Sequence, residues 1–395
     1  MFLNEFKIVR QIKFCLAKIW FPFFILQYNL SFLFKKNKIK TRLFTSSGNI
    51  SLINILSIIN EIGNFNEYED YLLVDTGKGR EDFIKKTLQL AKLHRFKKVF
   101  FVVNIRMETE IILNNICYFD EIYLLNHPVH IEPVKKIYNK TPITIIDEGA
   151  GSLLNYNSDK ISNLKSFKSH KYLDKLDFLG LEDLTTINFE NIDINEFKNI
   201  ATNLSEKYPI NTNGLEKEKT ILYCGVYWEV SGLDRETFAR EQKILLDNLI
   251  NAGYSILYKA HPRDNDFYGL ENNSRVYFID CKFPIELYNI DILALVSMSS
   301  TASLTTAHYW HVPCFSNVLD EAISKKENSV NINVIRYMVK EYSPNYKELL
   351  KLNVSNTPRY ILKQQIKDIY MNFIKDKPLL SQNEKIKEYV KQYGM

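Results

Sequence analysis

Short apolar runs alternate with helical patterns along most of the chain from residue 40 onward. Helical patterns at residues 50–62 and 82–93 separate runs that have the length of strands. Buried strands that alternate with helices of about 10–15 residues are typical of a parallel α/β sheet. The pattern therefore predicts an α/β domain over residues 40–155. Its expected strands are residues 42–47, 71–77, 97–104, 121–126 and 141–147.

A second alternation of the same kind begins at residue 219 and predicts a second α/β domain over residues 219–342. Between the two domains, residues 156–218 are polar and rich in Asn, Asp and Lys, and we expect short helices and a connection there. Residues 343–395 form a lysine-rich tail with a helical pattern. The fold class expected is two successive Rossmann-like α/β domains followed by C-terminal helices.

The N-terminal residues 1–39 have a different character. Residues 14–34 are apolar and aromatic, but a lysine, a proline and two polar side chains interrupt them, so they fail the test for a spanning helix. No small-residue cleavage site follows, which argues against a secretory signal. Trp20 and Phe23 are flanked by cations, as in an interfacial anchor on an acidic membrane. We expect peripheral membrane contact through residues 14–42; the alternative is a helix that packs on the body.

Charge and cysteine content exclude several classes of protein. The net charge is +5 and the 51 basic residues are spread along the chain, whereas a nucleic-acid binder more often concentrates them. The five cysteines are an odd number without CxxC spacing. This argues against a disulfide framework and a zinc site, and it favours a reducing cytoplasm. No nucleic acid, metal or cofactor is expected, and the sequence gives no expectation of oligomeric state.

Three motifs follow expected strands, where doubly wound sheets place their ligands. The first is the acidic pair Asp147-Glu148 followed by Gly149. A carboxylate on this tight turn could remove a proton from a sugar hydroxyl as a general base. The alternative is an ordinary turn with a solvated acid, because turns select Asp and Gly.

The second motif is His261-Pro262, between Lys259 and Arg263. Histidine can protonate a leaving phosphate or donate a hydrogen bond to it, and the neighbouring cations would neutralise its charge. Gly225, at an earlier strand end, is assigned to the same donor-binding group. The alternative is a turn histidine with exposed cations. A second His-Pro, at residues 127–128, lacks adjacent cations and is interpreted as a loop.

The third motif is Ser299-Ser300-Thr301, between a strand and a helical pattern. Hydroxyls at a helix N-terminus cap free N–H groups, and the same place binds phosphate well. Capping alone would explain the motif.

Together the acidic pair before Gly, the His-Pro and the Ser-Ser-Thr resemble the shared pattern of bacterial sialyltransferases, both the polysialyltransferases of capsule synthesis and the lipooligosaccharide sialyltransferases. The resemblance covers residues 141–307. It implies a GT-B fold, in which two Rossmann-like domains face each other across a cleft. It also implies CMP-sialic acid as donor, a capsular or lipooligosaccharide glycan as acceptor, and an inverting displacement without a metal. The expected location is the cytoplasmic face of the bacterial inner membrane.

The resemblance also implies roles for individual residues. Glu148 would be the base, with Asp147 orienting or replacing it. His261 would act as acid or hydrogen-bond donor to the CMP phosphate, and Ser299 and Ser300 would bind that phosphate.

Some relatives place the base in the second domain, where Glu229 and Asp234 are the candidates. On the acceptor side, Ser46, Ser47 and Asn49 follow the first strand and are expected to contact the acceptor together with Gly149.

Two other functions remain open. One is a GT-B transferase with another donor, such as the CDP-glycerol polymerases of teichoic acid synthesis, which also use a His-Pro and a serine cluster. The other is a non-catalytic, membrane-bound component of a polysaccharide assembly complex. No GxSxG or GxGxxG motif occurs, which weakens the hydrolase and dehydrogenase interpretations.

Overall fold

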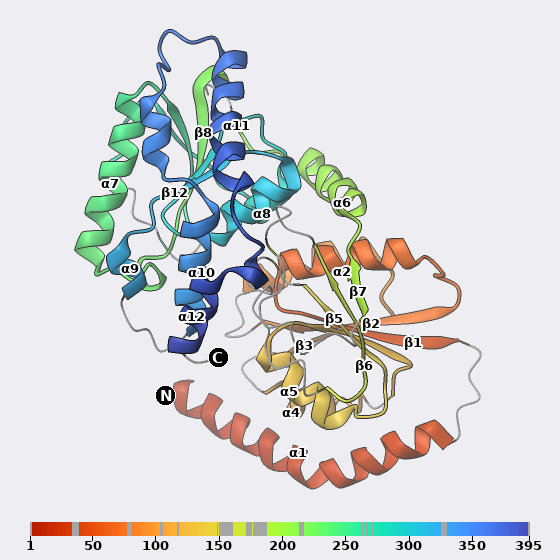
Figure 1. Ribbon diagram of the computed structural model, residues 1–395. Helices are drawn as coiled ribbons and strands as arrows, with labels where there is room; N and C mark the ends of the chain where they lie inside the picture. The colour runs from red at the N-terminus through yellow and green to blue at the C-terminus, as the bar shows by residue number, and fades with distance from the viewer. Residues whose placement is uncertain are drawn as a thin grey trace. The chain divides into compact units, whose positions relative to one another are not determined.

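The chain forms two compact units, which are described separately (Figure 1). The first comprises residues 1–148, 155–170 and 181–200, and the second comprises residues 149–154, 171–180 and 201–395. The computed structural model describes residues 2–33, 39–76, 81–102, 106–116, 118–147, 149, 161–170, 176, 188–212, 217–261, 264, 268–270, 272–324 and 330–393.

The first unit is built on a seven-stranded sheet of order β3-β2-β1-β4-β5-β6-β7, whose neighbouring strands are all parallel. Figure 1 shows α2 on one face of this sheet and α4 and α5 on the other. The elements are α1 (Phe2–Leu33), β1 (Lys40–Ser46), α2 (Asn49–Ile62), β2 (Tyr68–Asp75), α3 (Glu81–Ala91), β3 (Lys98–Val102), α4 (Met107–Leu113), β4 (Glu121–Leu125), α5 (Pro128–Ile137), β5 (Ile143–Ile146), β6 (Leu164–Ser169) and β7 (Asn188–Asn191), and α6 (Ile194–Lys207) follows.

The polar region between the two predicted domains contains two strands that the sequence analysis did not expect. Within the described residues of this region, β6 and β7 extend the first sheet, and the helices are α6, of 14 residues, and the short η4 (Lys217–Lys219). The reason for these strands is charge pairing: Lys168 is buried in β6, and its Nζ lies 2.7 Å from Glu190 Oε2 of β7 and 3.5 Å from Glu61 Oε1 of α2. A strand whose polar side chains are neutralised by neighbours need not be apolar.

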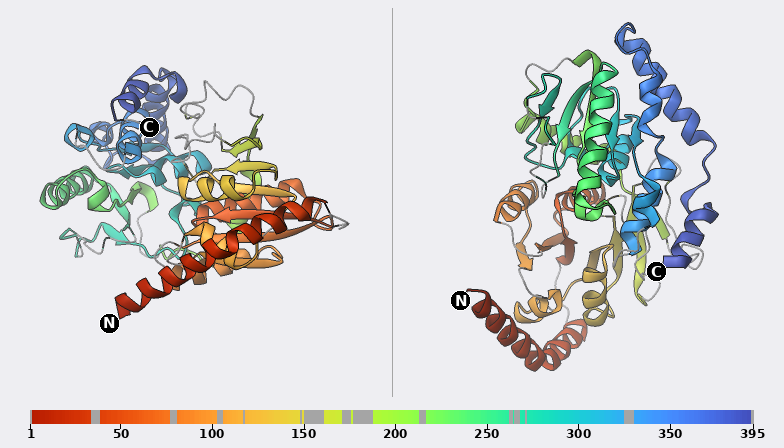
Figure 2. Two further views of the ribbon diagram at one scale, coloured as in Figure 1. Left: turned by 90° about the horizontal axis from the view of Figure 1, so that it is seen from below. Right: turned by 90° about the vertical axis from the view of Figure 1, so that its left-hand side faces the viewer.

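Helix α1 packs one face on the first unit and exposes the other. Ala17, Phe24 and Tyr28 are buried. The Tyr28 hydroxyl lies 3.2 Å from Thr141 Oγ1 and accepts a hydrogen bond of 3.1 Å from the backbone N–H of Lys140. In the left view of Figure 2, which looks from below, α1 runs across the first unit. Of the helices in the described ranges, none has both the length and the apolar character to span a bilayer.

The second unit contains a five-stranded parallel sheet of order β10-β9-β8-β11-β12. The central strand β8 is buried along its whole length, as a parallel strand covered on both faces should be. The elements of the second unit, up to its C-terminal segment, are β8 (Thr220–Cys224), η5 (Trp228–Val230), α7 (Arg235–Asn251), β9 (Ser255–Lys259), β10 (Val276–Phe278), η6 (Ile285–Leu287), β11 (Leu295–Ser297), α8 (Thr301–Trp310), β12 (Cys314–Ser316), α9 (Asp320–Ser324) and α10 (Val330–Tyr342).

The C-terminal segment is helical, as its sequence predicts, and packs on the second unit. It comprises η7 (Tyr346–Lys351), α11 (Arg359–Lys375) and α12 (Glu384–Tyr393). Leu362, Ile366, Tyr370 and Ile374 recur every four residues on α11 and are buried. The predicted fold class is confirmed in its two parallel α/β domains and its C-terminal helices. The cleft that the GT-B fold would place between the two α/β domains stays a prediction.

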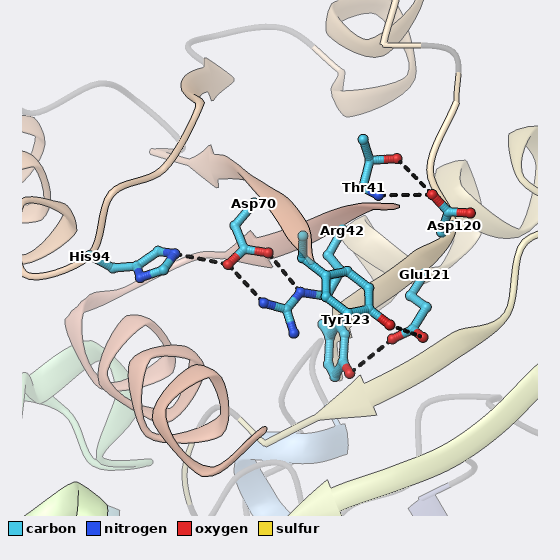
Figure 3. Close-up of polar contacts among 8 residues, drawn as sticks. Thr41, Arg42, Asp70, His94, Asp120, Glu121 and Tyr123 are labelled. Carbon is cyan, nitrogen blue, oxygen red and sulfur yellow. Dashed lines mark hydrogen bonds and ion pairs between the residues drawn. The ribbon is translucent and has the colours of Figure 1, made fainter. Parts of the chain in front are cut away.

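An ion cluster joins the amino ends of β1 and β2 in the first sheet (Figure 3). Arg42 of β1 is fully buried, and its Nε and Nη2 donate to the two carboxylate oxygens of Asp70 of β2 at 2.7 and 2.9 Å. His94 Nε2 lies 2.8 Å from Asp70 Oδ2. The cluster lies at the sheet edge opposite the strand ends that carry the predicted motifs, so it has a structural role.

Candidate active site

Three of the predicted donor residues meet at one edge of the second sheet. Gly225 follows β8, His261 follows β9, and Ser299 follows β11. The strand order reverses between β8 and β11, and doubly wound sheets bind ligands at this point, beyond the carboxyl ends of the strands. A cavity of about 210 Å³ lies there, and its lining includes Gly225, His261, Ser299, Ser300 and Thr301.

Gly225 is required by a close approach of two strand ends. Its N–H donates to the carbonyl of Lys259 at 2.8 Å. A Cβ at Gly225 would lie only 3.0 Å from both His261 N and Lys259 O, so a larger residue would push the histidine segment away. The His261 ring is stacked on Tyr227, with ring centroids 5.8 Å apart and an interplanar angle of 19°. Gly225 therefore sets the backbone of His261, and Tyr227 packs against its imidazole.

The serine cluster forms the N-terminus of α8. Ser300 Oγ accepts from Ala302 N at 3.2 Å, so the capping bond that the alternative interpretation expects is present. Ser297 Oγ accepts from Ser300 N at 3.2 Å and tightens the turn. Because the first N–H groups of a helix and its dipole attract anions, this end of the cavity suits a phosphate.

A carboxyl group that the sequence analysis did not single out lies near Lys259. Burial raises the pKa of Glu286, in η6, to about 7, and the positive charge of Lys259 opposes that rise. The Lys259 ammonium donates to the carbonyl of Ala260 at 2.5 Å. No sequence signal marked Glu286, because it stands alone in an apolar segment far from the motifs.

The two alternative bases have different surroundings. Glu229 is exposed in η5. Asp234 is the N-cap of α7, and its Oδ1 accepts from Thr237 N at 2.8 Å. This hydrogen bond lowers the pKa of Asp234, which makes it a weaker base. The assignment of either residue as base stays a prediction.

In the first unit, Asp147 lies at the end of β5 and is fully buried. Its Oδ2 accepts from Ser169 Oγ at 2.9 Å and from the backbone N–H of His170 at 3.4 Å. Asn54 Nδ2 of α2 donates to the Asp147 carbonyl at 3.0 Å, and Asn54 Oδ1 accepts from His170 Nε2 at 3.0 Å. A buried carboxylate held by these hydrogen bonds is suited to orienting a neighbouring residue, and it is less suited to contacting a substrate directly.

The end of β1 and the turn after it hold the predicted acceptor residues Ser46, Ser47 and Asn49, at the point where the strand order of the first sheet reverses between β1 and β4. The buried Ser46 Oγ donates to the carbonyl of Gly48 at 3.0 Å, and Asn49 Oδ1 accepts from Thr87 Oγ1 at 3.5 Å. Ser47 is partly exposed. Gly149 has a φ of +134°, which favours glycine. Their contact with an acceptor stays a prediction.

The interpretation of residues 127–128 as a loop is wrong. His127 is the N-cap of α5, and its Nδ1 accepts from Val129 N at 3.3 Å. His130 of the same helix is fully buried, and its Nε2 lies 4.0 Å from Asp75 Oδ2 at the end of β2. Burial lowers the pKa of His130 to about 3. The sequence analysis did not single out His130, because its approach to Asp75 depends on how α5 packs against the end of β2.

Three predicted site residues, Glu148, Pro262 and Arg263, lie outside the described residues. Within the part of the chain that the structure describes, no three His, Cys, Asp or Glu side chains are grouped as a metal site would require.

A family comparison identifies the chain's relatives. The model of the family described as alpha-2,8-polysialyltransferase matches residues 31–319, which is more than half of the chain and includes all three motifs. Among curated protein sequences, none matches the chain.

Solved structures with a similar backbone course share little sequence with the chain. The MnaA–UDP structure from S. aureus has a TM-score of 0.46 at 14% identity, covering 86% of this chain and 99% of that one. The UGT2 of Phytolacca americana, in complex with UDP-2fluoro-glucose and pterostilbene, has a TM-score of 0.49 at 8% identity, covering 91% and 99%. The glycosyltransferase SnogD from Streptomyces nogalater has a TM-score of 0.45 at 8% identity, covering 90% and 99%. These likenesses identify no substrate.

Proposed function

Since the chain belongs to the alpha-2,8-polysialyltransferase family and is a glycosyltransferase, we propose that it transfers sialic acid from CMP-sialic acid to a glycan acceptor. The observation that carries this proposal is the cavity of about 210 Å³ where His261 meets the hydroxyl cluster of α8. A hydrogen-bond donor beside a helix N-terminus suits a nucleotide phosphate. The proposed acceptor is a capsular polysaccharide or a lipooligosaccharide.

In the proposed reaction an acceptor hydroxyl attacks the anomeric carbon of the donor as the bond to CMP breaks, in one inverting displacement without a metal. His261 donates a proton or a hydrogen bond to the leaving phosphate, while Ser299 and Ser300 bind it. Glu148 accepts the proton of the attacking hydroxyl. Asp147 orients this base, a role that its buried hydrogen bonds support.

The test is nucleotide release by the purified protein. CMP-sialic acid and, separately, UDP- and CDP-linked donors would be supplied with and without sialylated or galactose-terminated acceptors. We expect CMP release that depends on an acceptor. Release from a CDP-linked donor alone would assign the chain to the CDP-glycerol type of transferase. A folded protein that releases no nucleotide would favour the non-catalytic component.

We also propose that α1 attaches the protein to an anionic membrane at the cytoplasmic face of the inner membrane. Six apolar side chains on its outward face are spaced four and three residues apart and are 40–64% exposed, namely Ile12, Leu16, Ile19, Phe23, Leu26 and Leu30. The helix carries four cations and a single acidic residue, Glu5. An apolar stripe with an excess of cations is complementary to anionic lipid.

Replacing both Ile19 and Phe23 with serine is expected to weaken binding to phosphatidylglycerol-containing vesicles at least tenfold, because burying each side chain is worth about 1.5–3 kcal/mol. Co-sedimentation would measure it, with Tyr360→Ser, 75% exposed in the second unit, as the control. Added salt should weaken wild-type binding. If vesicles are not bound and the stripe instead supports a dimer in analytical ultracentrifugation, the surface pairs two copies of the chain.

A further inference from the structure

A buried arginine lies in the wall of the same cavity as the His-Pro and serine motifs. Arg336 belongs to α10, and only 1% of its surface is exposed. The cavity of about 210 Å³ is lined by Arg336 together with His261, Ser299, Ser300 and Thr301. A guanidinium stays protonated at any physiological pH, so a permanent positive charge stands beside the proposed phosphate site.

Hydrogen bonds to oxygen atoms fix the guanidinium in place. Its Nε and Nη2 donate to the carbonyl of Val230 at 3.0 and 2.5 Å. Its Nη1 donates to the carbonyl of Ala322 at 3.1 Å and to Asn333 Oδ1 at 2.9 Å. The arginine thereby joins η5, α9 and α10 around one side of the cavity.

The backbone next to η5 is shaped to fit this arginine. Gly232 has a φ of +83°, and a Cβ there would overlap both the Ala322 carbonyl and the Arg336 guanidinium. Only glycine leaves room for the charge. The same segment begins at Tyr227, whose ring is stacked on His261. The position of the guanidinium and the position of the His261 ring are therefore linked through a few residues.

We propose that Arg336 is the specificity-determining residue by which this cavity prefers a phosphate-bearing nucleotide to the free nucleoside. The proposal rests on the proposed function, because the nucleotide is the CMP part of the donor. Its physical basis is that a charge on a buried side chain acts on a nearby anion more strongly than a charge on the solvated surface. Arg336 acts from the cavity wall, through its charge and through the segment that it holds.

The test compares the affinity for CMP with that for cytidine by isothermal titration calorimetry. The wild-type protein should bind CMP at least tenfold more tightly than cytidine. Arg336→Gln removes the charge and should lose most of that preference while retaining cytidine binding. Arg336→Lys keeps the charge and should retain the preference even where its overall affinities fall. Arg240→Gln, on a side chain that is 62% exposed on α7, is the control and should change neither ratio.

The outcomes separate this inference from the proposed function. A wild-type protein that does not bind CMP overturns the donor assignment, and the inference with it. In another outcome, the wild-type protein prefers CMP, and Arg336→Gln lowers the affinities for CMP and cytidine by the same factor. This result leaves the donor assignment intact and shows that Arg336 is structural only. A folded Arg336→Lys variant that binds CMP and cytidine equally also overturns the inference.

Discussion

Replacing His261 with alanine is expected to lower the rate of glycosyl transfer by about 100- to 10,000-fold, which is the usual contribution of a positioned acid or base. The imidazole lines the proposed donor cavity and is stacked on Tyr227, so its removal takes away the group that the proposed reaction uses at the leaving phosphate. The measurement is acceptor-dependent CMP release under saturating CMP-sialic acid. His261→Gln, which can still donate a hydrogen bond, should retain more activity than His261→Ala.

The matched control is His311→Asn, in the same unit. His311 is exposed and has a φ of +55°, a conformation that asparagine also adopts readily. This variant should keep wild-type activity. If a folded His261→Ala protein keeps more than a tenth of the wild-type rate, the role assigned to His261 is wrong.

Replacing Asp70 with asparagine is expected to cost about 3–5 kcal/mol of stability, because it leaves the buried Arg42 guanidinium without its counter-ion. Arg42 and Asp70 share two hydrogen bonds and are almost completely buried. Hydrogen exchange of peptides from β1, β2 and β4 would measure the loss within the first unit. Exchange in β8 and β9 should change much less.

Two further variants test whether the uncompensated buried charge causes the loss of stability. Arg42→Met combined with Asp70→Asn should recover part of the loss, since no uncompensated charge is then buried. Lys85→Met, which breaks the fully exposed Lys85–Glu81 pair, should leave the stability close to that of the wild type. If Asp70→Asn costs as little as Lys85→Met, the cluster does not hold the sheet together.

The same cluster predicts how acid acts on the fold. Burial alone would raise the pKa of Asp70, but hydrogen bonds from His94 and Arg42 outweigh it, and the pKa lies below its ordinary value of 3.8. A carboxyl with a lowered folded-state pKa stabilises the protein fully above its unfolded value. That contribution is lost as pH falls below 3.8 through the folded-state pKa. Asp70→Asn should flatten this part of the stability profile.

The sequence by itself determined the features that depend on neighbouring residues. Alternating apolar strands and helices predicted two parallel α/β domains, because burial on both faces makes each strand apolar along its own length. The predicted strands also placed the motifs at strand ends. The structure brings Gly225, His261 and the serines to one cavity. The family resemblance rested on the order of these motifs, and the family match confirms it.

The tertiary structure alone decided the features that depend on distant partners. Strand β6 is polar because Lys168 finds Glu190 and Glu61 across its neighbours, and no local pattern contains that pairing. Arg336 lines the proposed donor cavity from a segment that lacks any motif, and Glu286 is buried near Lys259 from another, since packing rather than sequence distance brings these charges into place. Sequence patterns record the burial of each element, whereas the partners of a buried charge are chosen only when the elements pack.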